Sequence, residues 1–332
     1  MDTNYQRGVV IRILEDEIFG TGGMSERHQV LEVEIAQGTT VEAVADMPWA
    51  KNQTGFEAGD RLIVSTMTIG EETSYVVTDA LRLPDVGLVV LCFIAIACWF
   101  GRRHGAMSLV GLAVSTGILV FGVAPAILAG YNALWVCTLG GAGILVVSLL
   151  LAHGFNRRTF VALGATLLAL LIAVVGATAA VDLIGLSGAG TEEAIFLQVG
   201  AVTGLSLRGV LLGGMIIGVL GVLDDVTTAQ SAAVEEIAKA DNTLTARELY
   251  RRGLSVGREH IASLVNTLAL AYAGASFPLF LLLTMKEGPP WWVVLNSEAI
   301  VEEVVRALVG GASLILAVPI ATVFAARVFA RR

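Results

Sequence analysis

The sequence predicts an α-helical polytopic membrane protein with about seven transmembrane helices and a small N-terminal β-rich domain outside the membrane. Of the 332 residues, 55% are hydrophobic and 15% are charged, which is too apolar for a soluble chain of this length. The apolar residues gather into stretches long enough to cross a bilayer. These stretches begin only after residue 82, behind a polar block rich in Asp and Glu.

The polar block, residues 1–82, has the pattern of β-strands. In HQVLEVEI, Leu31, Val33 and Ile35 alternate with two glutamates, which indicates a strand with one buried and one wet face. FEAGDRLIV and SYVVTDALRL are further strand candidates, separated by turns that contain glycine. A small barrel or sandwich is the natural outcome for this block, and we find no catalytic motif in it.

Residues 83–332 are expected to form the transmembrane bundle. Seven apolar stretches are candidates for its helices: 83–100, 106–123, 132–152, 160–184, 207–228, 259–284 and 305–326. Pro278 lies within the sixth and is expected to kink it at AGAS. Basic residues concentrate in every second connection and at the C-terminus, which predicts that these connections are cytoplasmic. The C-terminus is then inside and the polar block outside.

An odd number of helices with the N-terminal block outside requires a means of carrying that block across the membrane. Either the first helix translocates it, or a preceding anchor helix is missing from this sequence. We favour the missing anchor, because MDTNYQRGVV opens directly on polar residues.

The strongest candidate site lies in GVLGVLDDVTTAQSAAVEEI, where an apolar helix runs into Asp224 and Asp225. Ionised carboxylates in hydrocarbon are costly and normally face a bundle interior, a partner or water. Asp224, Thr228, Ser231 and Glu235 follow at helical spacing and predict one polar stripe. Such oxygen-rich stripes suit hard cations or protons, so Asp224 and Asp225 are also the candidate metal ligands. The alternative is that the helix leaves the membrane here, with both acids among the headgroups.

Further polar residues could complete this site. Asn266 lies about two turns into the next apolar stretch and would need a hydrogen-bond partner there, which a carboxylate could supply. At the outer side, Glu298, Glu302 and Glu303 form a second candidate site, the outer mouth of a path that ends at the aspartates. Glu302 and Arg306 have the spacing of a helical ion pair. The alternative is a turn of interfacial helix leading into the last span.

Residues 238–258 are expected to include a short cytoplasmic helix. Thr245 and Glu248 form a capping box in TARE and open a basic segment. This segment could dock a cytoplasmic partner, or it could lie against anionic headgroups. No nucleotide-binding loop, HExxH or GxSxG motif occurs, so we expect no enzyme activity and no cofactor beyond a bound cation.

Several runs resemble the YibE/F family of bacterial multi-spanning membrane proteins. They are GVLGVLDDVTTAQSAAVEEI, ELYRRGLSVGREHIASLVNTLALAYAGASFPL and NSEAIVEEVVRALVGGASLILAVP, and the resemblance covers residues 83–330. It implies a bacterial or archaeal cytoplasmic membrane, but it brings no activity, substrate or catalytic residue. Relatives usually carry a hydrophobic helix ahead of the β-like block, in agreement with the anchor suspected above.

Two functional hypotheses follow from these observations. The first is a transporter for a cation or a proton-coupled small solute, with Asp224, Asp225, Thr228, Glu235 and Asn266 as ligands. The second is a scaffold or sensor that does not transport and links the outer β domain to a cytoplasmic partner at 238–258. The lipid bilayer is the expected surrounding in both cases, no nucleic-acid partner is indicated, and homo-oligomerisation stays open.

Overall fold

The computed structural model describes residues 4–20, 25–35, 38–49, 54–69, 72–200, 204–285 and 288–330. Its internal contacts divide the chain into two compact units, Met1–Ile96 and Ala97–Arg332. The first unit holds the strands and the beginning of the first helix. The second holds the remaining helices.

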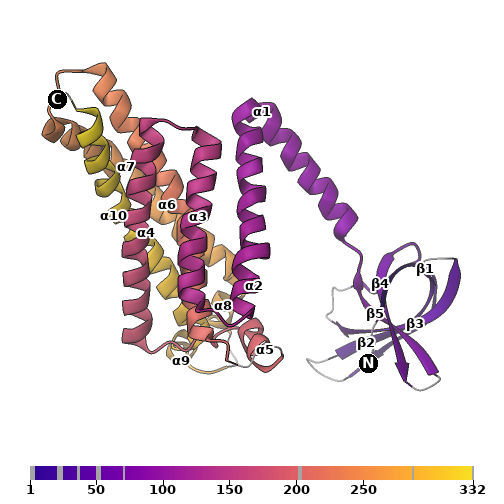
Figure 1. Cartoon of the computed structure of the whole chain (residues 1–332). Coiled ribbons are helices and arrows are strands. Elements are labelled where there is room, and N and C mark those ends of the chain that lie inside the picture. The colour runs from indigo at the N-terminus through magenta and orange to yellow at the C-terminus, as the bar shows by residue number, and fades with distance from the viewer. Residues whose placement is uncertain are drawn as a thin grey trace. The chain divides into compact units, whose positions relative to one another are not determined.

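The N-terminal strands form a closed five-stranded barrel (Figure 1). Around the barrel the order is β1-β2-β3-β5-β4, with β3 and β5 parallel and every other neighbouring pair antiparallel. This five-stranded Greek-key barrel has the architecture of the OB-fold. The strands are β1 (Asn4–Phe19), β2 (Ser25–Ile35), β3 (Thr39–Trp49), β4 (Arg61–Ile69) and β5 (Glu72–Ala80).

The alternation predicted for HQVLEVEI is confirmed, because Leu31, Val33 and Ile35 point into the barrel. Leu31 and Val33 are fully buried, and Ile35 is 8% exposed. They pack with inward residues of the other strands in a core separate from that of the helices. Of the two outcomes predicted for this block, the structure therefore has the barrel.

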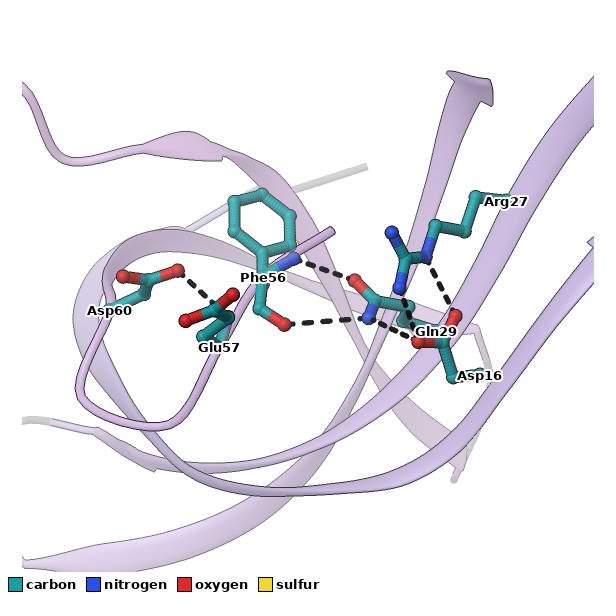
Figure 2. A network of polar contacts seen from close by, with 6 residues as sticks. All are labelled: Asp16, Arg27, Gln29, Phe56, Glu57 and Asp60. Carbon is teal, nitrogen blue, oxygen red and sulfur yellow. Dashed lines mark hydrogen bonds and ion pairs between the residues drawn. The ribbon is translucent and has the colours of Figure 1, made fainter. Parts of the chain in front are cut away.

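A polar network around the buried side chain of Gln29 fastens the connection between β3 and β4 to the barrel (Figure 2). The side-chain oxygen of Gln29 accepts a hydrogen bond from the Phe56 backbone N–H at 2.9 Å. Its amide nitrogen donates to Asp16 at 3.2 Å, and Arg27 binds the same carboxylate with two nitrogens, at 2.7 and 2.5 Å. A Cβ on Gly55 would lie 2.6 Å from the Gln29 and Arg27 side chains, so a larger residue would displace the network.

This network makes the barrel sensitive to acid. Hydrogen bonding to Arg27 lowers the pKa of the Asp16 carboxyl below its ordinary value. A lowered folded-state pKa contributes stability that is complete above the unfolded pKa of about 3.9 and is lost as the pH falls further. Asp16→Asn should therefore lower the stability of the barrel at neutral pH by up to about 1 kcal/mol, a difference that closes in acid.

Circular dichroism melts of residues 1–82 between neutral pH and strong acid measure this difference. Glu17→Gln, on the same strand, removes a carboxylate outside the network and should leave the wild-type pH profile unchanged. A constant gap between wild type and Asp16→Asn at every pH would contradict the assignment.

Six helical segments among the described residues are long and apolar enough to cross a membrane. The first two come from α1 (Leu83–Ile118), in which two helices meet at a kink at Arg102, where φ is 47°. A π-helical turn, η1 (Leu119–Val123), and α2 (Ala124–Leu128) extend the second of them. The six are Leu83–Arg103, Gly105–Leu128, α3 (Ala133–His153), α4 (Arg157–Ile184), α6 (Leu207–Ala240) and α10 (Glu298–Phe329).

The apolar stretch 259–284 is divided between two helices. It begins in the second half of α7 (Ala246–Ala275) and ends in α8 (Phe277–Leu282). The kink predicted at AGAS is confirmed, because α7 stops at Ala275 and α8 starts directly before Pro278. The basic segment expected as a short separate helix is instead the beginning of α7, since the chain has no proline between Thr245 and Ser276.

The helices of the second unit have two distinct ends (Figure 1). At one end lie the connections after α2, α4 and α8, together with α5 (Glu192–Gly200) and α9 (Trp291–Leu295). At the other, which we call the arginine-bearing end, lie the α3–α4 and α6–α7 connections and the end of α10. Here α4, α6, α7 and α10 share a small core of their own.

Candidate functional site

Asp224 faces a cavity of about 320 Å³ between the second half of α1, α3 and α6. Three serines, Ser108, Ser115 and Ser148, line the same cavity, and leucine and isoleucine side chains complete most of its wall. Among the lining residues of the described chain, Asp224 is the one that ionises. The cavity therefore presents one carboxylate and three hydroxyls within an apolar surrounding.

The sequence positions these four side chains by helical periodicity. Ser108 and Ser115 are two turns apart on one face of α1, and Ser148 comes from α3, which runs beside it. The far end of this α1 segment is held to α3 where Val123 lies against Gly140, which has no side chain to obstruct it. The cavity lies further along these two helices, between them and α6.

The depth of Asp224 follows from the length of α6. At about 1.5 Å per residue, Asp224 lies about 26 Å from the start of α6 at Leu207. Hydrocarbon is about 30 Å thick, so this carboxylate falls within the last few ångströms of the apolar layer, before the arginine-bearing end. Both interpretations drawn from the sequence, a buried site and an exit among headgroups, predicted a position near this boundary.

The two aspartates have different surroundings. Asp224 is half-buried and accepts a hydrogen bond of 3.5 Å from Thr228. Asp225 is exposed and lies within electrostatic range of His153 at the end of α3. In the part of the chain that the structure describes, no Lys or Arg forms an ion pair with Asp224. Asp224 is thus the carboxylate of the cavity, and Asp225 is its neighbour on the exposed side.

Further along α6, toward the arginine-bearing end, buried polar contacts join this helix to its neighbours. The hydroxyls of Thr227 on α6 and Thr166 on α4 lie 2.5 Å apart. The amide nitrogen of Gln230 donates to the Gly253 carbonyl of α7 at 2.9 Å and to the Thr322 hydroxyl of α10 at 2.8 Å. These bonds fix the rotation of α6 and therefore the direction in which Asp224 points.

The predicted stripe does not act as one unit. Ser231 is fully buried in the helix packing. Glu235 lies 3.2 Å from Lys239 and 3.9 Å from Arg158, so its charge is matched at the arginine-bearing end. Asn266 is exposed on α7, and no hydrogen bond links it to Asp224 among the described residues. The structure therefore brings Thr228 to Asp224 and places Glu235 and Asn266 elsewhere.

Glu298 and Glu302, predicted as part of the second site, hold a loop. The Glu298 carboxylate accepts hydrogen bonds from the backbone N–H of Ser187 at 2.5 Å, its hydroxyl at 2.8 Å and the Gly188 N–H at 2.8 Å. Glu302 is 3% exposed and accepts from the Gly190 N–H at 3.2 Å. These carboxylates thus fasten the segment after α4 onto the start of α10.

The ion pair predicted between Glu302 and Arg306 is replaced by another. Arg306 lies 3.5 Å from Glu303, one position further along α10. Glu302 is buried and instead accepts a hydrogen bond from the backbone N–H of Gly190 in the loop.

Removing the Glu298 carboxylate should release this loop. Hydrogen bonds to a charged group contribute about 1.5–3 kcal/mol, so in Glu298→Ala we expect Ser187 and Gly188 amides to exchange about 10- to 100-fold faster. Hydrogen exchange with mass spectrometry of peptides covering 185–191 measures this rate. Glu303→Ala is the matched control, because that carboxylate contacts Arg306 and should leave loop exchange unchanged. Equal acceleration in both variants would contradict the assignment.

No group of three or more His, Cys, Asp or Glu side chains able to hold a metal ion occurs within the described ranges. Asp224 and Asp225 are successive residues of one helix and point about 100° apart. A cation beside Asp224 would therefore draw its other ligands from hydroxyls and water, not from a carboxylate cluster.

The three serines of the cavity were not among the residues predicted from the sequence. The spacing of two of them is visible in GAMSLVGLAVSTG, where Ser108 and Ser115 share one helix face. What the sequence does not state is that this face meets α3 and α6, because the pairing of apolar helices depends on packing between them.

A barrel followed by long apolar helices, with a carboxylate facing a cavity among them, defines the class of the molecule: a polytopic membrane protein. Comparison with protein families matches residues 89–331 to the YibE/F-like proteins. The chain belongs to this family. No curated protein and no solved structure gave a significant match.

Proposed function

We propose that this protein transports a cation, or a small solute coupled to protons, through a site centred on Asp224. The observation that carries the proposal is the Asp224 carboxylate, which has no ion pair with Lys or Arg among the described residues and faces Ser108, Ser115 and Ser148 in an otherwise apolar cavity. A carboxylate at this depth needs a partner, water or a proton to be tolerated. Carboxylate and hydroxyl oxygens are the ligands that hard cations prefer.

The arrangement of the helices supports access from the arginine-bearing end. Asp225 and the end of α3 lie beside the cavity on that side, and Asp224 is about one turn inside the apolar layer. An ion would reach Asp224 from water over a short distance. The remaining path would run along the cavity between α1 and α6.

We further propose a topology with seven spans. The arginine-bearing end faces the cytoplasm by the excess of basic residues, which places the C-terminus inside and the barrel outside. This requires an odd number of crossings, and α7 with α8 supplies the seventh. At its start Gly257 packs against Val318 near the end of α10, and its far end, Phe280, shares a cavity with Ile300 near the start of α10.

Proteoliposomes test the function. The full chain is reconstituted, and flux of protons, Na⁺, K⁺ and Mg²⁺ is followed with ion-sensitive dyes under an imposed gradient. We expect one of these ions to cross faster than in liposomes without protein, and a proton-coupled solute to appear as proton flux only in its presence. Rates equal to protein-free liposomes for every ion and solute would favour the scaffold or sensor hypothesis.

A further inference from the structure

A groove of about 550 Å³ lined by arginines opens along the first turns of α7. Arg247, Arg251 and Arg258 contribute their side chains to it, and all three residues are exposed. Tyr250, Leu254 and Ser255 line the rest together with Glu248. The groove is separate from the Asp224 cavity, since none of its lining residues is shared with that cavity.

The groove keeps a net positive charge within the described chain, because three guanidinium groups stand against one carboxylate, Glu248, which interacts electrostatically with Arg251. No ion pair involves Arg247, Arg251 or Arg258 among the described residues, whereas neighbouring Arg252 pairs with Asp241 at 3.5 Å. The Glu248 carboxylate is committed to the capping box, where it accepts hydrogen bonds from the Thr245 N–H at 3.0 Å and its hydroxyl at 2.8 Å. Three guanidinium groups so placed attract an anion.

The packing of α7 on α6 gives the depth of the groove. A Cβ on Gly257 would lie 2.9 Å from the side-chain oxygen of Gln230, so these two residues are level. Gln230 is about 35 Å along α6 from Leu207, slightly more than the thickness of hydrocarbon. Arg258, the next residue of α7, therefore lies at the edge of the apolar layer. Arg251 and Arg247 lie about 10 and 16 Å further toward water along the helix.

The same face of α7 becomes apolar on the membrane side of Arg258. Ile261, Val265 and Ala269 follow Arg258 at helical spacing, and Ile261 and Val265 are half-exposed. Ala269 begins a second, almost wholly apolar cavity of about 160 Å³, in which Leu279 also takes part. One helix face thus offers guanidinium groups at headgroup level and a continuous apolar strip beneath them.

We propose that this groove binds the phosphate of an anionic phospholipid in the leaflet at the arginine-bearing end. Arg251 and Arg258 bind the phosphate oxygens, for which the planar guanidinium has matching donors, and Arg247 adds to the positive potential. The acyl chains lie along Ile261 and Val265. A lipid is favoured over a soluble anion because the charged and apolar surfaces adjoin at the membrane boundary.

Native mass spectrometry of the detergent-solubilised full chain tests the proposal, with phosphatidylglycerol and phosphatidylcholine as probes. The wild type should retain phosphatidylglycerol in preference to phosphatidylcholine. Arg251→Gln with Arg258→Gln should weaken phosphatidylglycerol binding about 30-fold, since each interfacial arginine contributes about fivefold. Arg251→Lys with Arg258→Lys keeps the charge and should restore part of the binding.

The control is Arg157→Gln with Arg252→Gln, which removes the same charge at the same end of the bundle but outside the groove. It should bind phosphatidylglycerol as the wild type does. Equal loss of phosphatidylglycerol binding in both double variants would show that the effect depends on net charge alone, and would overturn the proposed site. Displacement of the lipid by millimolar inorganic phosphate would overturn the lipid assignment, and so would a wild type that retains both lipids equally.

A melting measurement in phosphatidylcholine micelles checks that the variants are folded. A groove variant that melts with the wild type in phosphatidylcholine, yet gains no stability from phosphatidylglycerol, supports the site. A variant that melts lower in phosphatidylcholine but keeps the full phosphatidylglycerol increment contradicts it.

Discussion

Asp224→Asn is expected to reduce flux to the level of liposomes without protein. The substitution keeps the size of the side chain and its ability to accept a hydrogen bond from Thr228, but removes the negative charge. A cation in the cavity would then face hydroxyl and amide dipoles alone, which do not replace a carboxylate in an apolar surrounding. The measurement is initial flux in proteoliposomes with equal amounts of folded protein.

Asp225→Asn is the matched control for this prediction, because it removes the same charge one residue away on the exposed side. We expect flux to fall only in part, through the loss of local potential at the entrance. Ser148→Ala, inside the cavity, should weaken the apparent affinity for the ion and leave the maximal rate less affected. Full flux in the Asp224→Asn, Asp225→Asn double variant would remove the transport proposal.

Gly257→Leu is expected to produce the largest loss of stability in the bundle. A Cβ at this position would lie 2.4 Å from the Val318 side chain and 2.9 Å from the Gln230 oxygen. The leucine must therefore separate α7 from α10 and α6, and the Gln230 bonds to Gly253 and Thr322 would break with them. Overpacking of this kind lowers the free energy of unfolding by about 3 kcal/mol or more once the hydrogen bonds are included.

Thermal unfolding in detergent measures this loss. Gly274→Leu on the same helix is the control, because no atom lies within 4 Å of a Cβ there. It should melt with the wild type, or slightly above it, since leucine favours helix more than glycine does. If Gly257→Leu also melts with the wild type, the close approach of α7 to α10 is not as described.

The features that the sequence predicted well are those set by local periodicity. The inward residues Leu31, Val33 and Ile35 repeat every second position, and the break before Pro278 follows from a missing backbone N–H. The bounds of the first four apolar helices were predicted to within five residues for the same reason, since hydropathy is a local property. The predicted stretches 207–228 and 305–326 are shorter than the helices that contain them, Leu207–Ala240 and Glu298–Phe329.

The features that the sequence did not predict depend on which faces meet. Ser148 joins Asp224 only because α3 lies beside α6, and Asn266 is separated from it because that part of α7 turns its polar side outward. The partners of Glu298 and Glu302 were likewise not predicted, since the sequence paired Glu302 with Arg306. Both carboxylates accept hydrogen bonds from backbone N–H groups of a loop more than a hundred residues away, and side-chain patterns do not show backbone donors.

The closed barrel determines how the N-terminal unit can be recognised. Among the described strands it closes between β3 and β5 through two residue pairs alone, Ala43–Tyr75 and Val44–Val76, and β1 pairs with β4 only over Asn4–Val9. The strand edges beyond these pairings have no partner strand on that side among the described residues, so an extended peptide has a sheet edge to which it can add itself. Backbone pairing at this seam, and not only contact through surface side chains, is therefore open to a molecule that binds this unit.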